Sequence, residues 1–331
     1  MEPEKPPVKR SLLPAIGLFF VAPLVAEFLL GNLPIKLLMA LVMLAPMYGG
    51  GALLIRELVR RAGRGWPSIV LLALAYGIFE EAFATQSLFN PNYMHLNLHL
   101  LQPSFIPALG IGAWWTIFVL ALHMVWSISV PIALVEATVP GRAETPWLGG
   151  GGLAIIGLLF GVGVAGMTAM TLKQDRFMSS TGQFATAAAI LVLLAIAAFA
   201  MGKPAVASIA GSVPNPWLCG GLALASGSAI LLLPGVWGWW AAAAILLLEL
   251  AVGALVLAWS RRTAWNSRHK VALAGGAALA YAWHAFIETP VIGGAGVGVR
   301  VGNVVFALGA LALIAYGMKT TSSAKSLVAV A

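Results

Sequence analysis

Two adjacent glutamates and two histidines lie inside strongly apolar stretches of the sequence. Glu80 and Glu81 fall in the segment YGIFEEAFATQS, His123 lies in the next apolar stretch, and His284 lies much later in YAWHAFIETP. Imidazole and carboxylate groups can bind a metal ion that activates water, and a desolvated carboxylate can act as a general base without one. These residue types predict hydrolytic or proton-transfer chemistry inside a membrane.

Helical spacing predicts the neighbours of the paired glutamates. At about 100° per residue, Tyr76 and Glu80 share one face of their helix. Glu81 and Thr85 lie on a different face of it. We therefore expect the two carboxylates to contact different neighbours, with Tyr76 and Thr85 in supporting roles.

The two histidines have polar residues at helical spacing as well. Ser127 lies one turn beyond His123, and Tyr281, His284 and Glu288 follow one another at i, i+3 and i+7. A carboxylate near a histidine can fix its tautomer or share a metal ion. His123, His284 and Glu288 are the candidate metal ligands. Zinc would suit them, although the sequence leaves the cofactor open.

Acidic residues within apolar segments point to the same chemistry. A charged residue at mid-bilayer costs about 2.5–3.5 kcal/mol, so such residues are rarely accidental. Glu27 and Glu249 stand alone in their segments, and either a functional role or a hydrogen bond to a neighbouring helix would explain them. Six of the 11 acidic residues lie in apolar segments: Glu27, Glu80, Glu81, Glu136, Glu249 and Glu288. Glu249 is included with Tyr76, Thr85, Ser127, Tyr281 and Glu288 as a supporting residue.

The composition is that of an integral membrane protein. Of the 331 residues, 60% are hydrophobic and only 9% are charged, whereas soluble domains carry about 25% charged residues. The net charge of +8 is interpreted as a topology signal, and no nucleic-acid partner is expected. The single Cys219 excludes an intrachain disulfide or a CxxC redox pair.

Apolar runs predict an all-α polytopic protein with about ten transmembrane helices. Of the 19 Lys and Arg residues, 15 fall on one side and 4 on the other (15 + 4 = 19). This bias predicts that both termini are cytoplasmic. The predicted spans are 11–32, 34–58, 66–90, 113–138, 148–171, 183–202, 216–235, 237–259, 270–289 and 298–318.

Ten spans divide into two halves of five, which would have opposite orientations, as in many transporters. His123 would then correspond to His284, and Glu81 to Glu249. The whole chain is one predicted membrane domain. It comprises a cytoplasmic tail (1–10), a first half (11–171), a second half (183–318) and a second cytoplasmic tail (319–331).

The order of these motifs resembles that of the CAAX protease and bacteriocin-processing (CPBP) family of intramembrane proteases. That family has the patterns EExxxR, FxxxH and HxxxN. Here Thr85 stands in place of the arginine, Val119 in place of the phenylalanine and Glu288 in place of the asparagine. The resemblance covers these short segments only, which amount to well under half of the chain.

The resemblance implies that Glu80 or Glu81 activates water and that His123 and His284 bind or polarise the attacked group. An intramembrane hydrolase acting on a peptide or small molecule is the favoured function. A proton- or ion-coupled transporter with an inverted repeat is the alternative, followed by a non-catalytic membrane scaffold. The expected location is the cytoplasmic membrane of a prokaryote.

The expected partners are lipids and, through glycine-rich spans, a second copy of the chain. The pairs Gly157/Gly161 and Gly298/Gly302 have the GxxxG spacing that lets helices approach closely.

Overall fold

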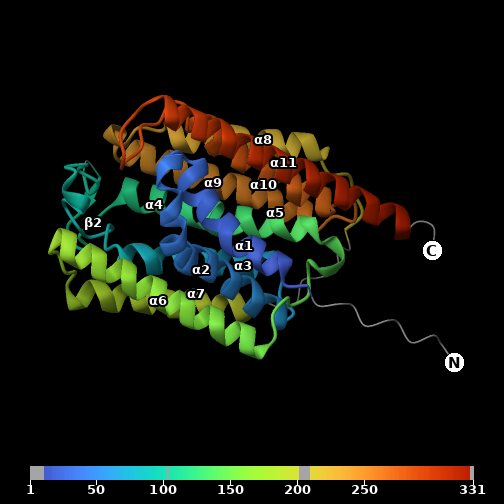
Figure 1. The fold of residues 1–331 in the computed structure, drawn as a ribbon, viewed down its shortest axis with the longest axis horizontal. Coiled ribbons are helices and arrows are strands. Elements are labelled where there is room, and N and C mark those ends of the chain that lie inside the picture. Colours follow the sequence, from blue (N-terminus) through green and yellow to red (C-terminus); the bar gives the residue numbers. More distant parts are fainter. Residues whose placement is uncertain (1–10, 103, 201–208, 329–331) are drawn as a thin grey trace.

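The computed structural model describes residues 11–102, 104–200 and 209–328, and nearly all of its regular structure is helical (Figure 1). The predicted N-terminal tail, 1–10, lies outside the described residues. The α-helices are α1 (Leu13–Pro23), α2 (Leu41–Arg61), α3 (Trp66–Phe79), α4 (Ala113–Ala121), α5 (Val130–Thr138), α6 (Gly150–Asp175), α7 (Thr181–Ala200), α8 (Pro216–Leu232), α9 (Trp239–Ser260), α10 (Ser267–His284) and α11 (Val297–Val328).

Shorter elements extend or connect these helices. Three are π-helical: η1 (Leu24–Leu29), η3 (Glu80–Ala84) and η5 (Leu122–Ser129). Four are 3₁₀ turns: η2 (Ile35–Ala40), η4 (Tyr93–His95), η6 (Pro140–Arg142) and η7 (Gly235–Trp237). The strands β1 (Phe105–Ile106) and β2 (Ile111–Gly112) form one small antiparallel hairpin, in which Phe105 pairs with Gly112.

The prediction of an all-α polytopic membrane protein is confirmed. Seven helices of the described chain are long and apolar enough to cross a membrane. Two shorter apolar helices, Leu13–Leu29 and Pro216–Leu232, occupy further predicted spans. Helix α10 corresponds to the remaining span, although it begins with the polar sequence Ser-Arg-His-Lys.

Three helix ends differ most from the predicted ones. The third span ends with η3 at Ala84, and α10 ends at His284. Beyond His284 the backbone switches to a tighter turn, with Ile287 N donating to His284 O, and Asn303 on α11 caps the Ala285 carbonyl. Helix α11 continues to Val328, past the predicted end at 318.

The helices form three groups side by side (Figure 1). Helices α1 to α5 make up the middle, where α1 packs on α2 and α3 packs on η5. On one side, α6 packs on α2 and α7 on α3. On the other side, α10 packs on α8, α11 and α5. The middle group is therefore shielded from both sides.

Helices α8 and α10 approach each other especially closely. A Cβ atom added to Gly276 would overlap the carbonyl oxygen of Gly220, so only glycine allows this contact. Most buried positions of α10 are alanine or glycine. Small residues let helix backbones meet where apolar lipid provides no hydrophobic driving force.

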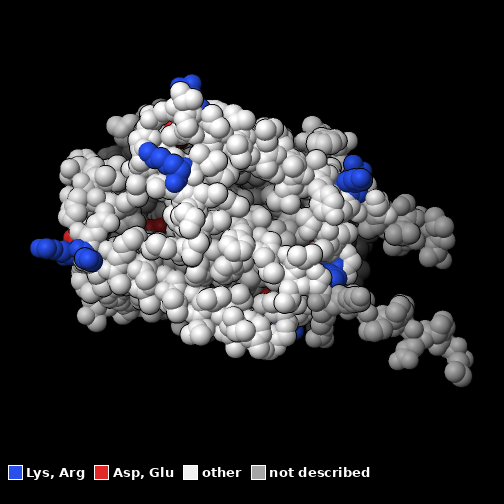
Figure 2. Space-filling model, in the orientation of Figure 1, with Lys and Arg blue, Asp and Glu red and all other residues white. Residues whose placement is uncertain are grey.

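The two ends of the described chain lie at the same end of the helix bundle. Ser11 accepts a hydrogen bond from Arg142, and Thr320 on α11 donates one to Ala137. Figure 2 shows Lys and Arg toward the ends of the long axis and an almost uncharged middle on this face. This distribution matches a bundle that crosses a bilayer along its long axis.

A buried ion-pair network ties α2 to α5 at this end. Glu136 accepts hydrogen bonds from Arg56 and Arg60 at 2.7–3.1 Å, and Arg56 also bonds Glu57. The Arg56 guanidinium lies 3.3 Å from the ring centre of Trp147. Glu136, expected to be a membrane-embedded acid, is therefore paired with two cations.

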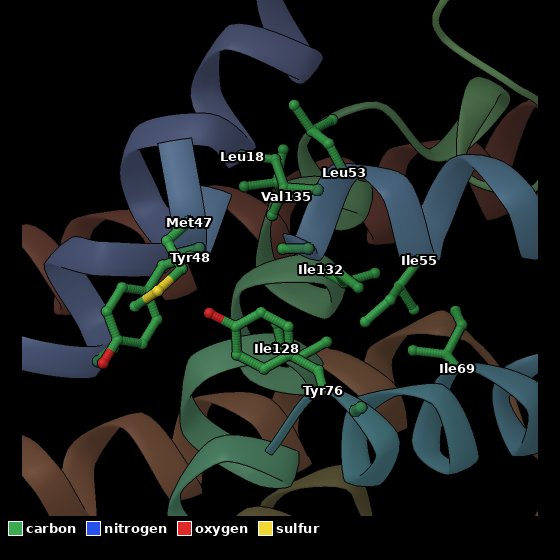
Figure 3. Close-up of a cluster of buried hydrophobic side chains, with 14 of the residues drawn as sticks. Leu18, Met47, Tyr48, Leu53, Ile55, Ile69, Tyr76, Ile128, Ile132 and Val135 are labelled. Carbon is green, nitrogen blue, oxygen red and sulfur yellow. The ribbon is translucent and has the colours of Figure 1, made fainter. Parts of the chain in front are cut away.

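The largest apolar cluster fills the space between α1, α2, α3 and α5. Figure 3 labels several of its residues, among them Leu18, Met47, Ile69 and Ile132. Tyr48 and Tyr76 lie next to each other at one edge of the cluster. Their hydroxyl groups mark the boundary between the apolar core and a polar site.

Candidate functional site

The polar site is built on three π-helical segments. Glu27 lies on η1, Glu80 and Glu81 on η3, and His123 on η5. Segments of this kind are rare, and they occur frequently at functional sites. Three of them carrying ionisable residues in one bundle mark this region as the candidate site.

The His123 imidazole lies between the two carboxylates. Its Nε2 atom is 2.7 Å from Glu81 Oε1, and its Nδ1 atom is 3.3 Å from Glu80 Oε2. Ser127 Oγ lies 3.2 Å from Nδ1, as the helical spacing predicted. Glu80, Glu81 and His123 are all at most 6% exposed. A proton can therefore move between these three groups in a dry environment.

The two carboxylates have different surroundings. Both oxygens of Glu81 have polar partners. Thr85 Oγ1 donates to Glu81 Oε2 at 2.9 Å, and Ser87 donates to the same atom. His123 contacts Glu81 Oε1. Glu80 Oε2 is buried and has no hydrogen-bond partner. Glu81 is thus held by several hydrogen bonds, whereas Glu80 Oε2 has only the 3.3 Å contact with His123 Nδ1 and can also contact a reactant.

Apart from His123, the two carboxylates contact different neighbours, as the helical spacing predicted. Both face His123, because the chain changes from α-helix to π-helix at Glu80. The Thr85 N–H bonds the Glu80 carbonyl at 2.9 Å, five residues back, instead of the carbonyl four residues back. This wider turn shifts the angular positions of the residues within it, so the 3.6-residue period no longer applies.

Glycine at two positions allows the helices around the site to pack closely. A Cβ atom on Gly77 would lie 3.0 Å from His123 Cβ, so glycine brings α3 against η5. A Cβ atom on Gly51 would overlap the ring of Tyr76, so α2 makes room for this ring. These positions determine how near His123 and Tyr76 come to Glu80.

The aromatic rings of Tyr48 and Tyr76 both lie beside the His123 ring. The ring centres of Tyr48 and Tyr76 lie 6.2 and 6.1 Å from that of His123. Both hydroxyl groups are within interaction range of the Glu80 carboxylate. The Tyr76 hydroxyl is buried and has no hydrogen-bond partner. It is thus free to donate to a reactant placed next to Glu80.

Glu27, which was expected to stand alone, is hydrogen-bonded to Tyr48 of this site. Its Oε1 atom accepts a hydrogen bond from the Tyr48 hydroxyl at 2.7 Å, and its Oε2 atom accepts one from Asn32 at 3.2 Å. A third carboxylate therefore adjoins the site.

His284 lies on the neighbouring helix α10, outside this group of residues. Its Nε2 atom is 3.8 Å from Glu288 Oε2, and its Nδ1 atom is buried without a hydrogen-bond partner. One turn earlier on α10, the Tyr281 ring stacks on Trp126 of η5 with ring centres 4.5 Å apart. The stacking fixes α10 against the segment that carries His123.

Glu249, on α9, is not linked to the other acids by any hydrogen bond or ion pair found in the described chain. Its Oε1 atom is buried and has no hydrogen-bond partner. Helix α9 packs on α4, the helix that precedes η5.

The donor atoms suit proton transfer better than metal binding. One atom each from Glu80, Glu81 and His123 can be chosen within 4.8 Å of one another, and this is the one such group found in the described chain. A catalytic zinc ion has three protein ligands at about 2.0–2.2 Å. However, the two carboxylates face opposite nitrogens of the same imidazole. This arrangement places a carboxylate oxygen at each ring nitrogen, so a metal ion bound to His123 would have to displace one of these two contacts.

The sequence did not identify every residue of this site. Ser87, which donates to Glu81, and Trp115, which donates to Ser87 at 3.0 Å, were not predicted, and Glu27 was predicted as a membrane-embedded acid but not as a neighbour of Tyr48. Tyr48 lies in an apolar segment and has no polar residue at helical spacing that would have indicated its role. Its contacts join segments far apart in the chain, which spacing within one helix cannot predict.

Comparison with curated proteins and with solved structures gave no match. A family model matches residues 17–329 and thus nearly the whole length of the chain. The chain belongs to this family, described as an uncharacterized membrane protein family.

Proposed function

We propose that the protein is an intramembrane hydrolase in which Glu80 activates water for attack on a peptide bond. The observation that carries the proposal is the position of His123 between two buried carboxylates, of which Glu81 is hydrogen-bonded and Glu80 Oε2 makes no hydrogen bond beyond its 3.3 Å contact with His123. This division of roles is what general-base catalysis needs, since one carboxylate must accept a proton while the other orients the histidine.

In the proposed reaction, water attacks the carbonyl carbon of the substrate and gives a proton to Glu80 Oε2. The electron pair of the carbonyl bond moves to its oxygen, and the free Tyr76 hydroxyl is placed to donate a hydrogen bond to that oxygen. When the carbon–nitrogen bond breaks, the proton returns to the amine through Glu80 or His123. Glu81 holds His123 and takes no part in bond breaking.

At two positions where the chain departs from the CPBP motifs, the replacing residue still makes a polar contact with the proposed site residues. Thr85, which replaces the family's arginine, still provides a hydrogen-bond donor to Glu81. Glu288, which replaces the asparagine, contacts His284. The proposal places the protein in the cytoplasmic membrane of a prokaryote, with its basic segments inside.

The test compares Glu80→Gln and Glu81→Gln in purified protein reconstituted in vesicles. The substrate is a library of synthetic peptides that each contain an apolar segment, and mass spectrometry detects cleavage. We expect Glu80→Gln to lower the rate by about 10²–10⁴-fold, since Gln cannot accept a proton. Glu81→Gln keeps acceptor and donor groups and should lower the rate less. A metal chelator should leave the wild-type rate unchanged.

The same vesicles distinguish the transporter alternative. A pH-sensitive dye inside them would report proton movement. Proton flux that requires Glu80, with no peptide cleaved by the wild type, would contradict the hydrolase proposal.

A further inference from the structure

Glu27 differs from the other acids of the site in its exposure. Glu80, Glu81 and His123 are buried, whereas Glu27 is partly exposed. It lies one turn before the end of the first span, where Asn32 donates to it. Glu27 is therefore the acid of this site whose side chain reaches the surface of the helix bundle.

The Tyr48 hydroxyl connects Glu27 to the buried centre. It donates to Glu27 Oε1 at 2.7 Å and is also within interaction range of Glu80. A phenolic hydroxyl can donate one hydrogen bond and accept another. Glu27, Tyr48, Glu80, His123 and Glu81 thus lie next to one another as a series of polar groups within an apolar bundle.

The proposed hydrolysis needs such a series of groups, and this inference rests on that proposed function. The general base works only while Glu80 is a carboxylate, yet Glu80 and His123 are enclosed by apolar residues, so any proton that Glu80 holds between cycles must reach water through other groups. We propose that Glu27 is the proton-exchange residue of the site and that Tyr48 relays protons between Glu27 and Glu80.

The relay step is balanced within these three residues. Tyr48 gives its hydroxyl proton to Glu27, and the Tyr48 oxygen takes a proton from the carboxyl group of Glu80 at the same time. Tyr48 is neutral before and after the step, Glu80 becomes a carboxylate, and Glu27 becomes a carboxylic acid. Glu27 then releases the proton to water.

The experiment measures hydrogen–deuterium exchange at the centre at constant pH. Protein in lipid nanodiscs is moved from H₂O to D₂O, and infrared difference bands are followed with time. The bands of the centre are those that disappear in Glu80→Gln and His123→Ala. The test variants are Tyr48→Phe, which keeps the ring and removes the hydroxyl, and Glu27→Gln, which keeps an acceptor for Tyr48.

We expect exchange at the centre to slow by about 100-fold or more in both test variants, which is the low end of what positioned acid–base groups contribute. Tyr316→Phe and Glu144→Gln are matched controls, since Tyr316 is 54% exposed and the Glu144 side chain 75% exposed. Both controls should exchange at the wild-type rate.

Wild-type exchange rates in both folded test variants would overturn the relay, even if peptide cleavage is confirmed. Slow exchange in both variants, in a protein that cleaves no peptide, would support the relay and contradict the hydrolase. Circular dichroism confirms that each variant is folded, and either variant alone suffices if the other does not fold.

Discussion

Replacing Gly77 with alanine tests whether close helix contact positions His123. The added methyl group would lie 3.0 Å from His123 Cβ and 3.2 Å from Leu120 Cδ2. Ordinary contacts of a Cβ atom begin at 3.4 Å, so α3 and η5 must separate by a few tenths of an ångström, about 0.4 Å (3.4 − 3.0). His123 would move away from Glu80 and Glu81 by a similar distance.

The change in stability caused by Gly77→Ala is the sum of two opposing effects. Overpacking a tight interior typically costs about 1–3 kcal/mol. Alanine stabilises a helix by about 0.5–1 kcal/mol relative to glycine. Gly161→Ala on α6 is the matched control, because a Cβ atom there meets nothing within 4 Å. Gly77→Ala should therefore be less stable than Gly161→Ala by about 1–3 kcal/mol.

Unfolding by SDS titration in mild detergent, followed by circular dichroism, measures this difference. Peptide cleavage measures the displacement of His123, since a misplacement of about 1 Å can cost about 10²-fold in rate. Equal unfolding midpoints for Gly77→Ala and Gly161→Ala would refute the close contact between α3 and η5.

Two further predictions concern the residues that hold the bundle and the histidine. Glu136→Ala should destabilise the protein by about 3–5 kcal/mol in the same titration, because two buried guanidinium groups lose their carboxylate; a loss similar to that of an exposed acid such as Glu144→Ala would contradict a buried network. Ser127→Ala should cost only about 0.5–1.5 kcal/mol and lower peptide cleavage without abolishing it, because His123 Nδ1 still faces Glu80 at 3.3 Å. Complete loss of cleavage in a stable Ser127→Ala protein would show that Glu80 does not hold this nitrogen.

The sequence by itself determined the class of the protein and the position of its spans. Long apolar runs are sufficient for this, because a backbone in lipid must satisfy its hydrogen bonds internally and therefore forms helices. The residue types of the site were also visible. Paired glutamates and a histidine in apolar segments are costly, and the residues Glu80, Glu81 and His123 do come together.

The tertiary structure decided which of these residues meet and how. The π-helical turn at Glu80 brought both carboxylates to one imidazole, against the prediction from a regular helical period. Where a helix widens depends on packing against its neighbours, and a period within one segment cannot encode it.

Partners from distant segments depended on the fold in the same way. Tyr48 joins Glu27 to the site across two helices, and Glu136 is neutralised by Arg56 and Arg60 from another helix. His284 instead pairs with Glu288 beyond the end of α10. Contacts between segments are set by how helices pack, and small residues such as Gly77 and Gly276 fix that packing by the space they leave.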